Sequence, residues 1–208
     1  ESFAAAVLAG DTAAADTRCD ADPSLVKRIF DLDDEILHKP AAANRLKALQ
    51  TAIDLGLDLN HFSYNTALHE AADKGQIEAA KLPIANGAKI SQRDHWYGGT
   101  VVDWARDAGH LELVDHLATY DSLNIFDAIA VNRLDLIRKI VTEDPAQLRL
   151  TFGETRSERS EPWGADWKTP LASAITRENL EAVKLLVELG APLDPIPDGQ
   201  TLADYADE

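Results

Sequence analysis

The chain has 208 residues, with 20 lysines and arginines against 36 aspartates and glutamates, and its formal net charge is -16. This length allows one large hydrophobic core or one extended repeat array. The acidity argues against a nucleic-acid-binding protein, which neutralises phosphates with basic side chains, and against a protein bound to an anionic membrane surface. We therefore expect no nucleic acid and no membrane as a partner.

The beginning of the chain, FAAAVLAGDTAAAD, predicts helix rather than a signal peptide, because it lacks a basic start and is interrupted by Gly10 and Asp11. No apolar run reaches the roughly 18 residues that span a bilayer. The single cysteine, Cys19, cannot form an internal disulfide, which favours a reducing compartment such as the cytoplasm. The chain contains no Met, so secretion after removal of a leader stays open.

Three segments share one pattern over their first positions. They begin at Thr66 (TALHEAADKGQIEAAKLPIANGAKI), Thr100 (TVVDWARDAGHLELVDHLA) and Thr169 (TPLASAITRENLEAVKLLVELGAPL). Each has a threonine that can cap a helix, a short apolar helix, a break at Gly, Asn or Glu, and a second amphipathic helix. Two of the segments reach Gly-Ala, where glycine supplies the left-handed residue that ends a helix. This recurrence predicts a helical repeat array.

The motifs TALHEA and TPLASA resemble the T-P-L-H-x-A signature of the ankyrin repeat, a turn and two helices of about 33 residues. With that template, weaker copies begin at Glu1, Glu35 and Leu123, and a truncated copy begins at Thr201. The resemblance covers nearly all of one domain, 1–208, and implies an all-α solenoid of stacked helix-turn-helix units with short hairpin fingers. The implied repeats are 1–34, 35–65, 66–99, 100–122, 123–168, 169–200 and a partial 201–208.

The interval between repeat starts departs from the period at two neighbouring places. From Thr100 to Leu123 it is short by about ten residues, so we expect the fourth hairpin finger to be missing. From Leu123 to Thr169 it is long by about thirteen residues, which places an insertion at about 150–168. Because the two irregularities are adjacent, one hypothesis is that the insertion folds back over the gap, as a lid or as part of a binding surface.

Two prolines fall inside expected helices. Pro40 lies in the first helix of the second repeat, and Pro83 lies in the second helix of the third. Proline removes a backbone hydrogen bond and clashes with the preceding helical turn, so we expect a kink at each. An alternative for Pro40 is that residues 36–44 form a loop and that the second repeat is aligned only from Arg45.

Only one stretch offers a lead to catalytic chemistry. HEAAD, from His69 to Asp73, comes one residue short of the helical zinc motif H-E-x-x-H, since Asp73 stands where the second histidine belongs. The ankyrin resemblance implies instead that Thr66 and His69 hydrogen-bond to the backbone and to neighbouring repeats. The other histidines form no pattern with a Ser or Cys nucleophile, and no phosphate-binding loop is present. We expect no enzyme activity, no cofactor and no metal, with a metal-dependent enzyme as the alternative.

The concave face of an ankyrin array is lined by the first helices and the fingers, so position x of the signature can touch a partner. The alignment places these residues at x: Ala5, Lys39, Glu70, Trp104, Asp127, Ser173 and Tyr205. Trp104 is the exception among mostly small or polar residues. The finger before it carries His95, Trp96 and Tyr97, and Trp163 and Trp167 flank the insertion. Alternatively, Trp163 and Trp167 pin the insertion onto the solenoid and Trp96 packs against the next finger.

Large exposed aromatic side chains are typical of interface hot spots. We therefore predict a non-catalytic protein-interaction module, monomeric, whose acidity favours a partner with a basic patch. The alternative is a docking or regulatory domain of a larger protein. The predicted partner-binding residues are His95, Trp96, Tyr97 and Trp104, rimmed by Glu70, Asp103, Arg106 and Asp127, with Trp163 and Trp167 at the insertion.

Overall fold

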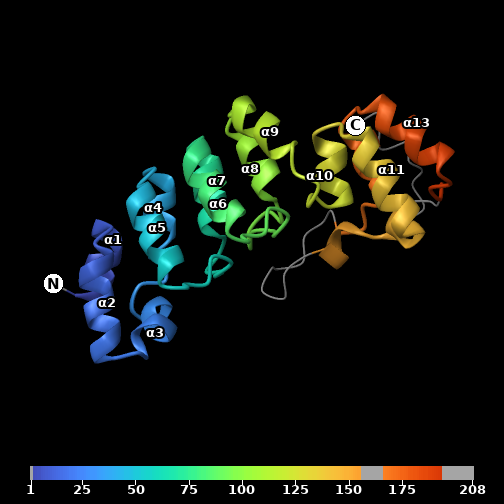
Figure 1. Ribbon diagram of the computed structural model, residues 1–208. Helices are drawn as coiled ribbons and strands as arrows, with labels where there is room; N and C mark the ends of the chain where they lie inside the picture. The colour runs from blue at the N-terminus through green and yellow to red at the C-terminus, as the bar shows by residue number, and fades with distance from the viewer. Residues whose placement is uncertain (1, 156–165, 194–208) are drawn as a thin grey trace.

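The computed structural model describes residues 2–155 and 166–193. Trp163, the partial repeat 201–208 and most of the predicted insertion lie outside these residues. Figure 1 shows helix pairs following one another along the chain. The pairs are α1 (Phe3–Ala9) with α2 (Thr12–Ala21), α4 (His38–Ala42) with α5 (Leu46–Asp54), α6 (Ala67–Asp73) with α7 (Ile77–Ala85), α8 (Val101–Asp107) with α9 (Leu111–Leu117), α10 (Ile125–Ala130) with α11 (Leu134–Glu143), and α12 (Pro170–Thr176) with α13 (Leu180–Glu188). The predicted all-α solenoid is confirmed.

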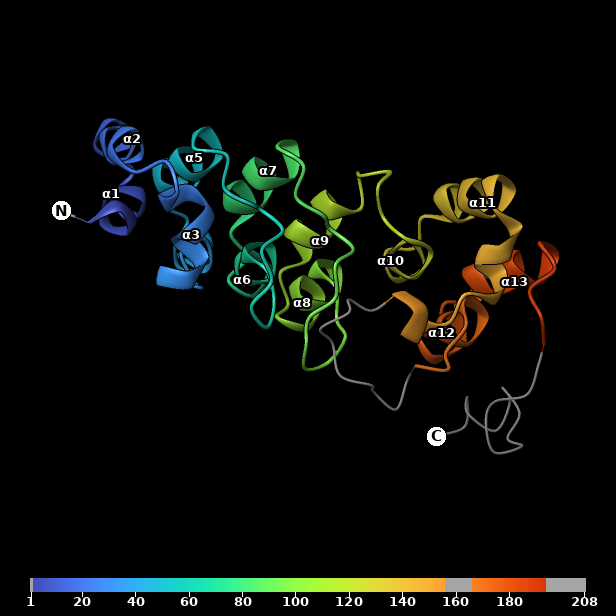
Figure 2. The ribbon, with the colours of Figure 1, turned by 90° about the horizontal axis from the view of Figure 1, so that it is seen from below.

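The helices form two layers, because each pair can bury its apolar stripe only against its neighbours. The first helices pack on one another, α4 on α6, α6 on α8, and α10 on α12. The second helices do the same, α5 on α7 and α11 on α13. Figure 2 shows the layer of second helices on one side of the layer of first helices. One continuous core of buried alanine, leucine, isoleucine, valine and phenylalanine side chains runs between them.

Each pair reverses direction through one residue in the left-handed conformation. These residues, with φ between 53° and 80°, are Gly10, Asn44, Gly75, Gly109, Asn132 and Glu178. At Gly75 there is a second requirement, because a Cβ atom there would lie 2.6 Å from Nδ1 of His110 in the next pair. The close approach lets Nε2 of His110 bond to the carbonyl of Asp73 at 2.9 Å, which ties the two pairs together.

The prolines act differently from one another. Pro40 is the third residue of α4, in the first turn, where its missing N–H has no intrahelical bond to lose. The loop alternative for residues 36–44 is wrong, since α4 spans His38–Ala42, and the expected loss of a helical bond does not arise. Pro83 lies within α7, which continues past it to Ala85.

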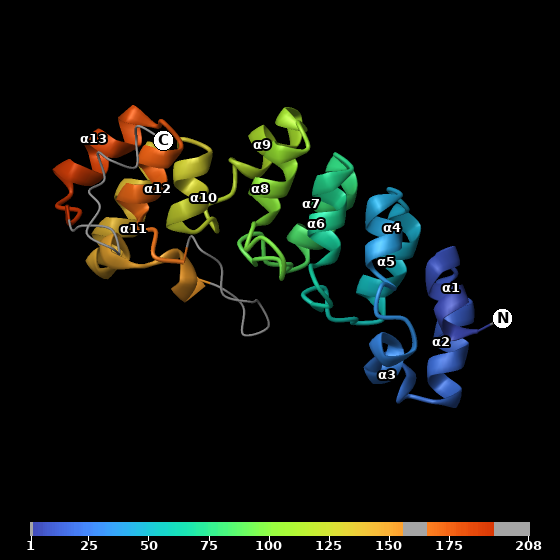
Figure 3. The same cartoon turned by 180° about the vertical axis from the view of Figure 1, so that it is seen from behind.

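The connections that follow the second helices are unequal. After the first pair, helix α3 (Leu25–Leu32) takes the place of the expected hairpin finger, because Leu25, Val26, Ile29 and Phe30 give the segment one apolar side. Figures 1 and 3 place α3 on the same side of the solenoid as the loops that precede α6 and α8. After the fourth pair, residues 118–124 join α9 directly to α10, with no projecting finger.

The start of the insertion occupies the space beside that short connection. After the 3-10 helix η1 (Pro145–Arg149), a second one, η2 (Phe152–Thr155), is closed at its base by backbone bonds from Phe152 to Lys168 (2.8 Å) and from Gly153 to Asp166 (2.9 Å). The Phe152 ring meets Phe126 of α10 edge-on, with ring centroids 5.3 Å apart. The base of the insertion is therefore part of the packed structure. No helix of the described residues is long and apolar enough to cross a membrane.

Two leucines on α9 give a matched test of this packing. Leu113 is fully buried, whereas Leu111 is 64% exposed on the same helix. We expect Leu113→Ala to lower the free energy of unfolding by about 2 to 5 kcal/mol, because it leaves a cavity between pairs. Leu111→Ala should change it by less than about 0.5 kcal/mol. Urea denaturation of both variants measures this, and equal losses would contradict the assignment of the core.

Candidate functional site

The finger between α7 and α8 is organised by one buried carboxylate, that of Asp94. Its Oδ1 accepts hydrogen bonds from the backbone N–H groups of Trp96 (2.7 Å) and Tyr97 (2.8 Å). Its Oδ2 accepts one from the Gly99 backbone N–H (2.7 Å) and one from the indole Nε1–H of Trp104 (3.0 Å). Because the Asp94 side chain is fully buried, these donors depend on it and not on water. The fingertip is therefore a fixed turn joined to helix α8.

This turn presents two of the predicted aromatic residues to solvent. Trp96 is 51% exposed and Tyr97 is 65% exposed. Trp96 stacks on Tyr64 of the preceding finger, with ring centroids 5.3 Å apart and planes 11° apart. The two fingers are further joined by a 2.7 Å bond from the backbone N–H of His95 to the carbonyl of Tyr64. We call Tyr64, Trp96 and Tyr97 the aromatic surface.

Tyr64 was not among the predicted residues, although it is 56% exposed. A signal was available, because Tyr64 lies just before Thr66, the start of the third repeat, as Trp96 and Tyr97 lie before Thr100. Trp96 does pack on a finger, as the alternative has it, but on the preceding one and not the next, and the residue stays 51% exposed. Trp96 therefore packs on the neighbouring finger and is still accessible to a partner.

Trp104 lies behind the aromatic surface and is half-buried. It meets the ring of His69 edge-on, with centroids 5.2 Å apart. Burial lowers the pKa of His69 to about 4, so this histidine is neutral at pH 7. Its Nδ1 accepts a bond from the Thr66 backbone N–H at 3.2 Å, and its Nε2 donates to the Gly99 carbonyl at 3.3 Å.

These two bonds bear on the HEAAD alternative. Both ring nitrogens of His69 serve the helix cap and the next finger, so neither has a lone pair for a metal. Asp73, in the second ligand position, is instead 2.6 Å from Nζ of Lys74. Within residues 2–155 and 166–193, no group of three or more His, Cys, Asp and Glu side chains is placed to hold a metal ion.

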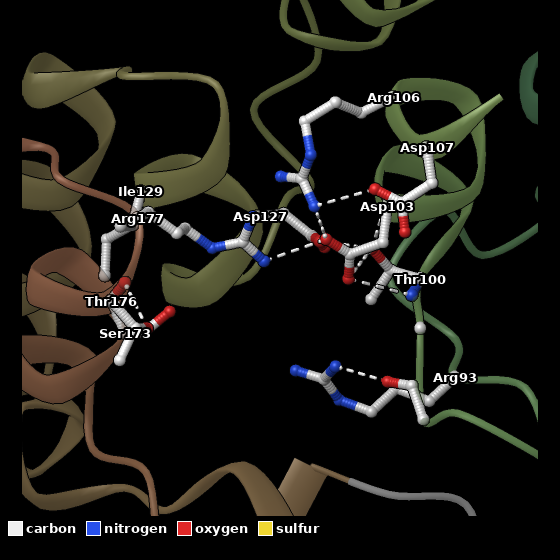
Figure 4. Close-up of polar contacts among 12 residues, drawn as sticks. Arg93, Thr100, Asp103, Arg106, Asp107, Asp127, Ile129, Ser173, Thr176 and Arg177 are labelled. Atoms are coloured by element: carbon white, nitrogen blue, oxygen red, sulfur yellow. Dashed lines mark hydrogen bonds and ion pairs between the residues drawn. The ribbon is translucent and has the colours of Figure 1, made fainter. Parts of the chain in front are cut away.

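Asp103 does not belong to a solvent-facing rim, contrary to the sequence prediction. Its side chain is 12% exposed, and its Oδ1 lies 2.9 Å from Arg106 and 2.8 Å from Arg177. Figure 4 shows both guanidinium groups directed at the Asp103 carboxylate, that of Arg106 from α8 and that of Arg177 from the end of α12. Burial opposes ionisation, but Arg177 and Arg106 together hold the pKa of Asp103 below its usual value. Asp103 therefore links α8 to the end of α12 and stays charged.

Asp127 is also buried, whereas the sequence prediction placed it on the rim of the partner-binding surface. Helix α10 begins one residue later than the alignment implies, with Asn124 as its cap, so Asp127 occupies the third position of the helix, like His69 in α6. There its carboxylate accepts a 2.5 Å bond from the Thr100 hydroxyl and another bond from the Ser91 hydroxyl. Burial, assisted by the charge of Asp103, raises the pKa of Asp127 to about 6.

Arg93 completes this buried polar cluster and was not predicted from the sequence. Its guanidinium donates to the Gly98 carbonyl (2.6 Å) and to the Thr155 hydroxyl (2.6 Å). It also lies over the ring of Phe152, 3.5 Å from the centroid. The finger that carries Trp96 and Tyr97 is therefore held by the base of the insertion. A hollow of about 980 Å³ lies beside this contact, with Arg93 and Thr155 in its lining.

The structure describes three of the four remaining predicted residues. Glu70 is half-buried, and its carboxylate accepts a 2.7 Å bond from the Asn65 side chain. His95 is half-buried and meets Tyr64 edge-on, with centroids 5.8 Å apart. Trp167 is half-buried in the segment that leads to α12, and Trp163 lies outside the described residues.

Two hollows flank the aromatic surface. One, of about 180 Å³, lies beside Tyr64 and Trp96 and reaches Glu70. The other, of about 300 Å³, is lined by Tyr97, Trp104, Asp73, Asp107 and Ala108. Aromatic and acidic groups therefore occur together on this face.

Comparisons with known proteins agree with a repeat fold. No protein-family model matches the chain. It is 27% identical over 207 residues to the E3 ubiquitin-protein ligase XBAT32 of Arabidopsis thaliana, covering 97% of the chain and 39% of that protein. It is 37% identical over 84 residues to the human ARF GTPase-activating protein GIT2, covering 39% of the chain and 11% of that protein. Both relatives contain ankyrin repeats, and at this low identity the matches point to the ankyrin-repeat family.

A solved structure was also found. A chain in the complex of the predatory endopeptidase Bd0816 from Bdellovibrio bacteriovorus with immunity protein Bd3460 aligns with 82% of this chain and 90% of its own length, with a TM-score of 0.49 and 16% sequence identity. The chain spans less than half the length of the two curated relatives above, so it corresponds to one part of each.

The shifted pKa of Asp127 predicts a specific dependence of stability on pH. The folded state keeps the proton up to about pH 6, while the unfolded chain loses it near pH 3.9, so this group's stabilising contribution falls as the pH rises between these values. Asp127→Asn removes the titration while keeping an oxygen for Thr100. Relative to the wild type, it should gain about 2 to 3 kcal/mol of unfolding free energy between pH 4 and pH 6.5. Denaturation at several pH values measures this, and a constant difference would contradict it.

Asp94 gives a second prediction. Asp94→Asn replaces one acceptor oxygen by an NH₂ group that faces two buried donors, each costing about 1 to 3 kcal/mol if left unsatisfied. We expect faster hydrogen exchange at the backbone amides of Trp96, Tyr97 and Gly99, measured by NMR. Asp58→Asn is the control, because that exposed carboxylate in the preceding finger accepts a backbone bond from Asn60. Equal hydrogen-exchange rates at these three amides in the two variants would contradict the role of Asp94 in holding the fingertip turn.

Proposed function

We propose that the chain is a non-catalytic protein-interaction module that binds its partner across the fingertips and the adjoining concave face. The observation that carries the proposal is the aromatic surface of Tyr64, Trp96 and Tyr97, exposed yet held in place by Asp94 and by stacking between fingers. Aromatic side chains bury a large area on binding, and a surface that is already ordered loses little further entropy.

The partner of such a surface is a protein, and the charge of this chain favours one with a basic patch. Acidic residues accompany the aromatic rings, with Glu70 beside Trp96, and Asp73 and Asp107 beside Tyr97. Rings that lie beside carboxylates combine hot-spot burial with attraction to a basic group. His95 and Trp104 extend this proposed surface, whereas Asp103 and Asp127 support it from within.

A second candidate is a docking or regulatory domain of a larger protein. The extent of the comparisons favours it, because the chain corresponds to 39% of XBAT32 and to 11% of human GIT2. A docking domain uses the same binding surface and differs only in what is attached to it. Both candidate functions therefore require the aromatic surface to bind a partner protein.

The proposal is tested by capturing the partner from an extract of the organism that encodes the chain. We expect wild-type protein to retain a specific partner and the double variant Trp96→Ala with Tyr97→Ala to bind it at least about 30-fold more weakly, as loss of a hot spot does. Trp104 is left intact in this test, because its indole bonds to Asp94 and its loss would disturb the finger.

The control variant is Leu111→Ala with Leu180→Ala, which removes two equally exposed apolar side chains from the second helices. It should bind the partner as the wild type does. Retention by all three proteins would contradict the proposed surface, and the far-UV spectrum of each variant checks that the solenoid is folded.

A further inference from the structure

The 300 Å³ hollow next to the aromatic surface combines two ring systems with two carboxylates. Asp73 is the last residue of α6 and Asp107 is the last residue of α8, so both stand at helix C-termini on neighbouring repeats. Trp104 lies one turn before Asp107, and Tyr97 reaches the hollow from the fingertip. Four groups from three separate segments therefore converge on one space.

The electrostatics of this hollow favour a cation. The carbonyl end of a helix carries partial negative charge, and an aspartate at that end adds a full one. Both features occur twice here, at the ends of α6 and α8. The rings of Trp104 and Tyr97, which line the hollow, add the negative potential of their π-systems, which attracts an ammonium or guanidinium group.

The chain's own basic residues pair with these two carboxylates only at the surface. Arg106 lies 2.9 Å from Asp103, and its contact with Asp107 is longer, at 3.4 Å. The Asp107 side chain is 75% exposed. Lys74 pairs with Asp73, but both groups are on the surface, where such pairs exchange readily with other ions. An incoming cation could therefore contact both carboxylates without displacing a buried pair.

We propose that this hollow binds one lysine or arginine side chain of the partner protein. The aliphatic stem lies against Trp104 and Tyr97, and the charged group lies between Asp73 and Asp107. An anionic side chain is repelled from this place, and a neutral apolar one would strip water from two carboxylates without replacing it. The inference rests on the proposed function, because it assumes a protein partner.

The closing experiment uses a small probe and needs no partner. Arginine capped as its N-acetyl methylamide is titrated into isotope-labelled protein, and the Trp104 indole and Ala108 amide signals are followed by NMR. Capped lysine is titrated in the same way. Capped citrulline, which has the shape of arginine but no charge, is the matched control ligand.

We expect saturable shifts at Trp104 and Ala108 with either basic probe, at least ten-fold weaker binding of the citrulline probe, and weaker binding in higher salt. Asp73→Asn with Asp107→Asn should reduce the affinity at least five-fold. Asp54→Asn, which removes an exposed carboxylate from α5, should leave it unchanged.

Equal binding of citrulline and arginine would overturn the proposal, as would unchanged affinity in the double variant. Shifts confined to other residues would do the same. The citrulline comparison uses wild-type protein only, so it holds whatever the variants do to folding. If the basic probes do not bind while partner capture depends on Trp96 and Tyr97, the proposed function is supported and the proposed binding of a basic side chain in the 300 Å³ hollow is contradicted. If the probe binds while capture is independent of these residues, the interaction surface lies elsewhere.

Discussion

Each helix pair of this chain has an apolar face that only the next pair can cover, and the rest of the structure follows from this constraint. Polar groups buried at a junction must then find partners across it, because water does not reach them. Three histidines do this by bonding to a backbone carbonyl of a neighbouring repeat. His38 and His69 bond through Nε2 to the Asn65 and Gly99 carbonyls of the following fingers, and His110 bonds back to the Asp73 carbonyl.

The fourth pair is joined to the later pairs partly by charged side chains. No finger projects from the fourth pair, so its backbone groups are not available to the neighbouring side chains. Asp103 pairs instead with Arg177, 74 residues away, and Arg93 pairs with Thr155 and Phe152 at the base of the insertion. Burying such charges is costly unless they are paired. Asp103 has two guanidinium partners, and Arg93 donates two hydrogen bonds and lies over the Phe152 ring. The insertion thus supplies contacts that the missing finger cannot make.

The sequence was sufficient for the helical pairs because a period of about 33 residues and the left-handed residue between helices are local signals. It also located Trp96 and Tyr97, since fingertip positions protrude in any stacked array. Asp127 was misplaced because counting along a signature assigns a face only if the helix starts in register, and α10 starts one residue late at Asn124. Helix α8 does start in register, and Asp103 was misplaced because it holds the buried third position that His69 holds in α6. Arg93 left no local signal, because its partner Thr155 is 62 residues away.

The buried carboxylate of Asp94 determines what the site can offer a partner. Because it takes the indole N–H of Trp104, that residue presents ring surface but no free donor. Because it takes the amides of Trp96 and Tyr97, the fingertip backbone presents few donors of its own. The site therefore offers a partner two kinds of contact. The ring surfaces can pack against many different partner side chains, whereas the carboxylates of Asp73 and Asp107 favour basic ones. Affinity at this face should therefore come mainly from the rings, and the choice between partners mainly from the charges beside them.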